Sequence, residues 1–309
     1  IVSLFILICI AVYQRRFFMT MDVVAAYLNA KMEPDTIYVR INAYLTGLLC
    51  VLNPGYSEYV DHKGELVCEV LRALYGSLQA GVLWNRLMTK TLLDIGYIQN
   101  PYDQCVFNKM DNGVQCTVLL FVDDLLCTST SKQMLHELHQ HMVNTFTEVK
   151  MSMESIFTFL GMEIDISKPG VAILTQVGYI KSMLEQYKVT RKAITPARDD
   201  LFDIDASSPL LCSAKKSEFY SVVYKLMYIG KRTRPDILLP AIFLTTRTHS
   251  PTEQDNRKLY RILEYLNHAP YVPLVLNVGD SLQLYSYMDA SHAVHKDMKG
   301  HSGMVLQLG

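Results

Sequence analysis

Two adjacent carboxylates, Asp123 and Asp124, stand in the middle of an apolar run at residues 118–127. A run this rich in Val, Leu and Phe predicts two short buried strands, with the acidic pair in the turn between them. Two carboxylates at that turn repel each other and lose hydration unless a cation neutralises them. Mg²⁺ is the simplest such cation, because it prefers oxygen ligands and usually also binds substrate phosphates. The alternative is an ordinary Asp-Asp surface turn, which needs no metal.

Two other segments bear on this choice. Asp22 stands at the end of residues 16–23, whose apolar side chains predict a strand. Residues 74–84 predict a strand, then a turn at Gly76, then the start of a helix. At least two carboxylates are needed to hold a pair of metal ions, which can stabilise the attacking and leaving oxygens of a phosphoryl displacement together.

The elements around these acids predict an antiparallel α+β arrangement rather than a parallel α/β sheet. Residues 105–122 form a predicted hairpin around Asn112-Gly113, a pair that tolerates the positive φ of tight turns. Apolar spacing predicts helices over residues 83–95 and 134–146 and a mostly helical stretch over residues 217–268. Pro169 followed by Gly170 predicts a turn between two strands. Gly96 predicts the end of the first helix.

Taken in chain order, residues 19–29, 74–84 and 118–127 resemble the palm motifs of a reverse transcriptase from a copia-like LTR retrotransposon polyprotein. Residues 159–164 resemble the hairpin that grips the primer, with Phe159, Leu160, Gly161 and Met162 at its centre. Further matches follow in the connecting region at residues 224–237, in the helix before RNase H at residues 251–266, and in the first RNase H strand at residues 287–291. The resemblance therefore covers nearly the whole chain.

The resemblance implies a right-hand polymerase palm, an antiparallel sheet with packed helices, joined to a helical thumb and connection and a truncated RNase H-like start. It assigns residues 1–190 to the palm, with partial fingers, the primer grip and the start of the thumb. Residues 191–279 become the thumb and connection, and residues 280–309 the first part of the RNase H-like domain.

The resemblance also implies an RNA-directed DNA polymerase, a nucleotidyltransferase (a transferase) that extends a primer 3′-hydroxyl. We assign Asp22 and Asp123 as bridging ligands of two Mg²⁺ ions, with Mn²⁺ as a substitute, and Asp124 as a third acid nearer the primer end. Catalysis would then come mainly from positioning and charge stabilisation.

Four residues receive substrate-binding roles from the resemblance. Tyr27 would lie beneath the nucleotide sugar and exclude a 2′-hydroxyl; its alternative is a core tyrosine on a helix. Gln79 would touch the nucleotide, and Gly76 would let the backbone come close to it. Phe121 replaces the more usual tyrosine beside the acidic pair.

The two ends of the chain carry expectations of their own. Residues 1–12 are almost wholly apolar but too short to span a bilayer, so we expect a buried helix and no membrane partner. We expect the chain to begin inside a longer polypeptide, after the fingers segment. Asp289 matches the first RNase H acid, and the remaining acids would lie beyond Gly309, so RNase H activity is expected to be absent.

Composition is that of an ordinary intracellular enzyme. Half of the 309 residues are hydrophobic and no pair of the seven cysteines has C-x-x-C spacing, which predicts free thiols in a reducing compartment. The resemblance implies an intracellular location, either cytoplasmic and particle-associated or nuclear. His136, His139 and His141 share one predicted helix, where a solvated face is favoured over a metal site.

Charge gives only weak support for nucleic-acid binding. The net charge is −1 and the pI about 6.8, whereas a phosphate-binding domain usually has a basic face. Two local clusters stand out against this neutral background, and a solvated surface is the alternative for both. The first contains Lys225, Lys231, Arg232 and Arg234, and the second Arg257, Lys258 and Arg261.

Three functional classes remain open at this stage. The first is a polymerase whose partners are an RNA or DNA template-primer, deoxynucleotides and the rest of the polyprotein, including fingers, integrase and full RNase H. The second is an inactive retroelement remnant or a domesticated nucleic-acid-binding module with a palm fold. The third is another palm-type metal enzyme such as a cyclase, which fits the acids but not the Gln79 segment.

Overall fold

The computed structural model describes residues 1–32, 37–279, 281–293, 298 and 300–309. The chain separates into two compact units, one formed by residues 17–153 and the other by residues 1–16 together with 154–309. The predicted boundaries at residues 190 and 279 stay predictions.

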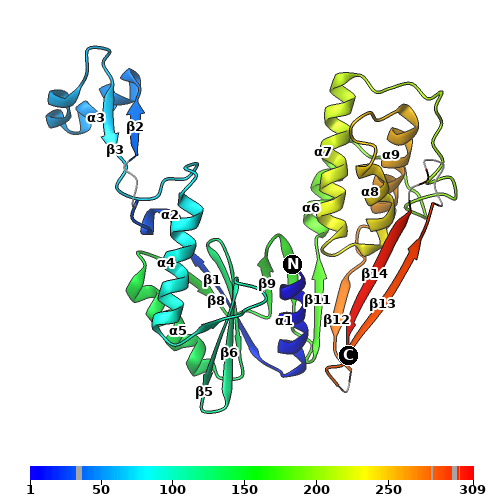
Figure 1. The fold of residues 1–309 in the computed structure, drawn as a ribbon, viewed down its shortest axis with the longest axis horizontal. Helices are drawn as coiled ribbons and strands as arrows, with labels where there is room; N and C mark the ends of the chain where they lie inside the picture. Colours follow the sequence, from blue (N-terminus) through cyan, green and yellow to red (C-terminus); the bar gives the residue numbers. More distant parts are fainter. Residues whose placement is uncertain (33–36, 280, 294–297, 299) are drawn as a thin grey trace. The chain divides into compact units, whose positions relative to one another are not determined.

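A six-stranded antiparallel sheet forms the centre of the unit at residues 17–153 (Figure 1). Its strand order is β4-β5-β6-β7-β1-β8, so the first strand of the chain is inserted between two later ones. The strands are β1 (Phe17–Val23), β4 (Ile98–Gln99), β5 (Val106–Asp111), β6 (Val114–Phe121), β7 (Asp124–Ser129) and β8 (Val149–Ser152). The β5–β6 hairpin turns at Asn112 and Gly113, both with positive φ, which confirms the predicted Asn-Gly turn.

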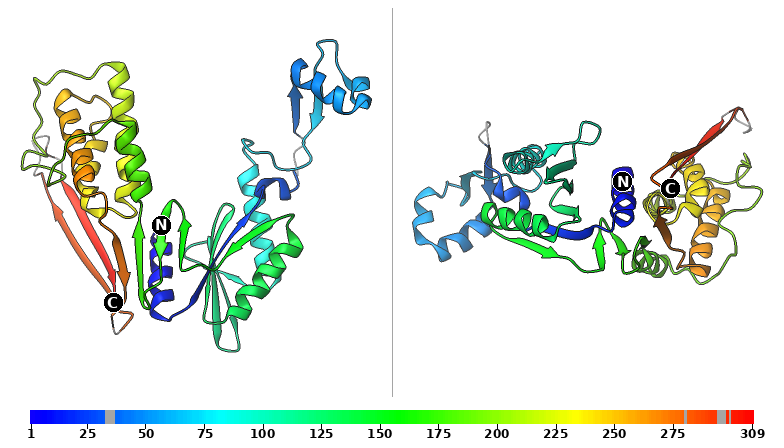
Figure 2. Two further views of the ribbon diagram at one scale, coloured as in Figure 1. Left: turned by 180° about the vertical axis from the view of Figure 1, so that it is seen from behind. Right: turned by 90° about the horizontal axis from the view of Figure 1, so that it is seen from below.

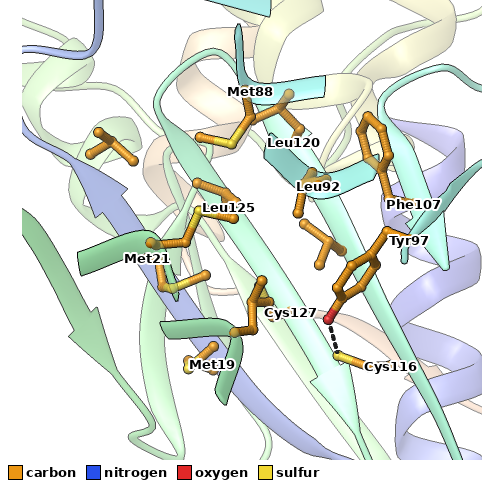
Figure 3. Close-up of a cluster of buried hydrophobic side chains, with 14 of the residues drawn as sticks. Met19, Met21, Met88, Leu92, Tyr97, Phe107, Cys116, Leu120, Leu125 and Cys127 are labelled. Atoms are coloured by element: carbon orange, nitrogen blue, oxygen red, sulfur yellow. Dashed lines mark hydrogen bonds between the residues drawn. The ribbon is translucent and has the colours of Figure 1, made fainter. Parts of the chain in front are cut away.

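Helices α4 (Ala80–Asp94) and α5 (Lys132–Thr145) contribute the apolar side chains that cover this sheet. Met88 and Leu92 of α4 pack with Met21, Leu125 and neighbouring sheet residues in a core where sulfur-containing side chains are prominent (Figure 3). The phenol of Tyr97, also buried there, donates a hydrogen bond to the Cys116 sulfur. The predicted helices are confirmed, and Gly96 follows the end of α4 with φ +86°.

The remaining elements of this unit are short. Helix α2 (Ala26–Asn29) follows β1. Strand β2 (Tyr38–Ile41) pairs with β3 (Leu66–Glu69), and the chain between these two strands forms α3 (Ala43–Leu52) and the 3₁₀ helix η1 (Pro54–Tyr59). The strand predicted at residue 74 is wrong. Arg72 makes one isolated bridge with Lys31, and the following residues turn directly into α4, because no neighbouring strand continues the pairing.

The second unit contains a four-stranded antiparallel sheet of order β12-β11-β10-β9. Helix α1 (Val2–Tyr13) packs on β11 and β12, with one face buried and Ile1, Val2 and Ile6 exposed. The predicted N-terminal helix is therefore confirmed as a helix with one covered face. The strands are β9 (Ile156–Phe159), β10 (Met162–Asp165), β11 (Val171–Thr175) and β12 (Leu274–Asn277).

A group of helices occupies residues 177–268 of this unit, as the sequence pattern predicts (Figures 1 and 2). Helix α9 begins after Thr252, whose hydroxyl accepts a hydrogen bond from the backbone N–H of Asp255 while the Asp255 carboxylate accepts one from the backbone N–H of Thr252. Such a capping box satisfies two otherwise unpaired donors. The helices are α6 (Val177–Gln186), α7 (Ser213–Gly230), the 3₁₀ helix η2 (Pro235–Ile237), α8 (Leu238–Thr245) and α9 (Glu253–His268).

A two-stranded sheet follows, formed by β13 (Leu284–Ser291) and β14 (His301–Leu308). None of the helices formed by the described residues is long and apolar enough to cross a membrane. None of the seven cysteines, all of which lie within the described ranges, forms a disulfide bond.

Arg234, which we predicted to belong to a basic surface cluster, is buried. The side chain of Arg234 is 1% exposed and forms an ion pair with Asp236, with Nη2 2.8 Å from Oδ2. Its Nη1 donates a hydrogen bond to the Ala269 carbonyl. The prediction that Arg234 contributes to a surface cluster is wrong, because its donors are used inside the protein.

Candidate functional site

The sheet register brings the three predicted acids to one place. In the β1–β7 pairing, Asp22 lies directly opposite Asp124, and the backbone N–H of Val23 donates to the Asp123 carbonyl at 3.2 Å. Opposite residues of an antiparallel pair carry their side chains on the same face, with Cβ atoms about 4.5–5.5 Å apart. The acids far apart in sequence therefore become neighbours because β1 is inserted beside β7.

The turn that carries Asp123 is held in an unusual conformation. Val122 has φ +57°, a left-handed value that is rare for a β-branched residue. The indole N–H of Trp84, which is buried at the start of α4, donates a hydrogen bond to the Val122 carbonyl. Trp84 thus links the helix of the second predicted segment to the acidic turn. Our sequence reasoning gave Trp84 no role, although it is the single tryptophan of the chain.

The carboxylates at this turn interact with one another. Burial raises the pKa of Asp124 above its ordinary value, and the carboxylates of Asp123 and Asp22 raise it further. Lys150 of β8 occupies the position opposite Asp22 on the other neighbouring strand, a feature that nothing in the sequence indicated. A cation bound at these carboxylates would remove the repulsion that raises the Asp124 pKa.

The donor chemistry of the site suits a hard divalent ion, since its acids offer carboxylate oxygens. Within the described ranges, however, no group of three or more His, Cys, Asp or Glu side chains is arranged to hold a metal ion. The metal-ligand roles of Asp22, Asp123 and Asp124 therefore stay predictions that the backbone register supports. His136, His139 and His141 lie on exposed or half-buried positions of α5.

Tyr27 lies on α2, immediately after β1. Its ring centroid is 4.5 Å from that of Tyr75, in the segment that leads to α4, and the side chain is half-buried against the core. A Cβ atom at Gly81 would come within 3.9 Å of its hydroxyl. The side chain is thus partly packed and partly exposed, and its sugar-binding role stays a prediction.

The other predicted nucleotide contacts lie in the same unit. Gly76 has φ +92°, a conformation that favours glycine, and a Cβ added there would meet nothing within 4 Å. Gln79 is the half-buried residue preceding α4, and Phe121 is 51% exposed at the end of β6, opposite Asp124. Their roles toward a nucleotide are untested.

The segment predicted as the primer grip is the tight β9–β10 hairpin of the other unit. Leu160 and Gly161 form its turn with φ values of +49° and +74°, between the buried Phe159 and Met162. The Tyr228 hydroxyl donates to the Leu160 carbonyl at 3.1 Å, and the Gln176 amide donates to the Gly161 carbonyl at 3.2 Å.

Further contacts hold Gln176 and Tyr228, the two residues that donate to this turn. The Thr233 hydroxyl donates to Gln176 Oε1 at 2.9 Å, and the Arg232 guanidinium lies 3.8 Å from the centre of the Tyr228 ring. Our sequence reasoning missed the role of Gln176 altogether. Tyr228 and Thr233 belong to the segments that resemble the connecting region, which was the available signal.

Asp289 lies on β13, exposed and opposite Gly303 of β14. Its carboxylate accepts a hydrogen bond from the backbone N–H of Ala290. An RNase H-like role for this residue stays a prediction.

Comparison with known proteins identifies the relatives of this chain. Residues 1–197 match the family model described as reverse transcriptase (RNA-dependent DNA polymerase). The chain is 31% identical over 281 residues to a retrovirus-related Pol polyprotein from transposon RE1 of Arabidopsis thaliana, a match covering 87% of this chain and 18% of that protein. It is 26% identical over 288 residues to a putative transposon Ty5-1 protein of Saccharomyces cerevisiae, covering 92% and 87%. The polyprotein from transposon TNT 1-94 of Nicotiana tabacum is 26% identical, with 88% and 20% covered.

The chain thus spans about a fifth of the two plant polyproteins and most of the yeast protein. The resemblance to copia-like retrotransposon polyproteins is confirmed.

Proposed function

Because this chain belongs to the reverse transcriptase (RNA-dependent DNA polymerase) family, we propose that its β1–β7 acids form the nucleotidyl-transfer site. The observation that carries the proposal is the register of Asp22 against Asp124, with Asp123 in the adjoining turn. The raised pKa of Asp124 supports it, because mutual repulsion is the cost expected of carboxylates gathered to hold cations.

Asp22 and Asp123 would hold two Mg²⁺ ions, with Asp124 as the third acid. Bound divalent ions would supply charge stabilisation for the attacking and leaving oxygens of an in-line phosphoryl transfer. The protein's own contribution is positional: β1 and β7 fix the acids, and the Trp84 hydrogen bond holds the Val122 turn.

The nucleotide would lie over the same unit, in contact with Tyr27, Gln79 and Phe121. Its partner strands would be an RNA or DNA template and a primer, and the Leu160-Gly161 turn would contact the primer. Fingers, integrase and full RNase H would come from the rest of a polyprotein.

Primer extension with Mg²⁺ and deoxynucleotides tests the proposal. Asp123→Asn keeps the side-chain shape but removes the charge, so we expect extension to fall by at least about 100-fold, as the loss of a metal contact implies. Asp111→Asn makes the same change at the exposed end of the β5–β6 hairpin and should leave extension unchanged. Equal rates for Asp123→Asn and the parent chain would refute the assignment, and template binding without any extension would favour the inactive remnant.

A further inference from the structure

Helix α3 carries an apolar surface that the described part of the chain leaves uncovered. Its ten residues include no charged side chain, and a helix that is apolar on all sides is typical of a protein interior. Thr46 is nevertheless the only buried residue of α3, and among the described elements only η1 makes extensive contacts with it. Five large side chains, which we call the α3 stripe, are exposed: Tyr44, Leu45, Leu48, Val51 and Leu52.

The α3 stripe is continuous and large enough to need a partner. Tyr44, Leu48, Val51 and Leu52 stand at i, i+4, i+7 and i+8, a spacing that places side chains on one face of a helix. Val51 and Leu52 are 80% and 82% exposed. Large apolar side chains present on the order of 100–200 Å² each, so the stripe approaches the roughly 800 Å² that each partner buries in a stable interface. Monomeric proteins rarely expose contiguous apolar patches larger than a few hundred Å².

The shape of α3 is that of a helix that packs against another helix. Tyr44, Gly47, Leu48 and Val51 stand at i, i+3, i+4 and i+7, and four residues in this arrangement form the hole that receives a side chain of a facing helix. Gly47 deepens the hole because it has no side chain, and a Cβ added there would meet nothing within 4 Å. Leu48 and the neighbouring leucines of the stripe are the side chains that can enter such a hole. The surface therefore has both halves of a self-complementary contact.

We propose that the α3 stripe is the interface of a homodimer, in which α3 packs against α3 of a second copy of this chain about a two-fold axis. A two-fold interface brings a patch against the same patch, so any charged side chain in it would lie close to a like charge. The α3 stripe contains none, and the nearby Arg40 is already paired with Asp61 and Glu65. The interface includes none of the residues proposed for the polymerase site.

The test is sedimentation equilibrium of the full chain over a range of concentrations. The parent chain should show a reversible monomer–dimer equilibrium with a dissociation constant in the micromolar range or tighter, as interfaces of this size show. Leu48→Lys combined with Val51→Lys should weaken dimerisation by at least about 100-fold, about tenfold for each apolar side chain that is no longer buried.

A neutral variant separates lost apolar packing from repulsion between introduced charges. Leu48→Gln combined with Val51→Thr makes the stripe more polar without adding charge and should weaken dimerisation by at least about tenfold. The matched control is Tyr102→Lys combined with Ile194→Lys, which places two charges at exposed apolar residues elsewhere and should leave the dissociation constant unchanged. Circular dichroism checks that each variant is folded. A dimer that survives both stripe variants, or is weakened equally by the control, would overturn the proposal.

Other occupants of the stripe give different results. A parent chain that stays monomeric up to about 100 µM would overturn the proposal. If that monomer floats with phosphatidylcholine vesicles and the lysine variant does not, the stripe binds a lipid surface instead. Association into larger species without a defined dimer would also refute the two-fold contact. Every variant keeps Asp22, Asp123 and Asp124, so primer extension tests the polymerase proposal separately.

Discussion

Replacing Gly161 by alanine should damage the β9–β10 hairpin for two separable reasons. The first is backbone conformation, because φ +74° costs an L-residue about 1–2 kcal/mol. The second is a collision, because a Cβ at this position would overlap the Tyr228 hydroxyl, the group that donates to the Leu160 carbonyl. Displacing that hydroxyl removes a hydrogen bond worth about 0.5–1.5 kcal/mol. The expected total is a loss of about 1.5–3.5 kcal/mol in the free energy of unfolding.

Gly170→Ala is the matched control. Gly170 has φ +80° in another hairpin of the same sheet, but nothing lies within 4 Å of the added Cβ. It should therefore show only the conformational cost of about 1–2 kcal/mol. The difference between the two variants isolates the collision with Tyr228.

Urea unfolding followed by circular dichroism measures both variants, each also in a Tyr228→Phe background. Removing the phenol oxygen should recover part of the Gly161→Ala loss and none of the Gly170→Ala loss, so a double-mutant cycle should give a coupling energy of about 0.5–1.5 kcal/mol. Equal costs for the two glycine substitutions, or a cycle with no coupling, would refute this account of the hairpin.

Three further predictions concern single side chains. Asp124→Asn should raise the free energy of unfolding by less than about 1 kcal/mol at neutral pH, because the pKa of Asp124 is raised in the folded state. This gain should shrink as the pH falls toward the ordinary carboxyl pKa of 3.8. A gain that persists in acid would contradict the link between the raised pKa and stability. Arg234→Ala should destabilise the chain by about 3 kcal/mol in thermal unfolding, since it leaves Asp236 without its ion-pair partner, and a change within experimental error would show that the pair is dispensable. Tyr27→Ala should increase the use of ribonucleotides relative to deoxynucleotides in primer extension if the ring blocks the sugar 2′ position, whereas lost stability with unchanged sugar preference per active molecule would make Tyr27 a core residue.

Local elements were predictable because their signals are local. Asn112-Gly113 specifies a tight turn through its tolerance of positive φ, and Gly96 ends α4 in the same way. Helices α4, α5 and α9 follow from the spacing of their apolar residues. The chain's family was also predictable, because several short motifs in the correct order are far more specific than any one of them.

Errors arose where contacts in the folded chain outweighed a pattern read from the sequence. Arg234 seemed to belong to a surface cluster, yet Asp236 and the Ala269 carbonyl satisfy its donors in the interior. The strand expected at residue 74 requires a pairing partner, and only Arg72 has one.

By itself, the sequence determined which acids are available, which local turns and helices form, and to which family the chain belongs. The tertiary structure alone decided that β1 lies between β7 and β8, which places Asp22 against Asp124. Apolar strands have similar sequences, and many pairings between them keep the same alternation of apolar and polar side chains. The order of the strands therefore depends on how the faces of the complete sheet pack against the helices.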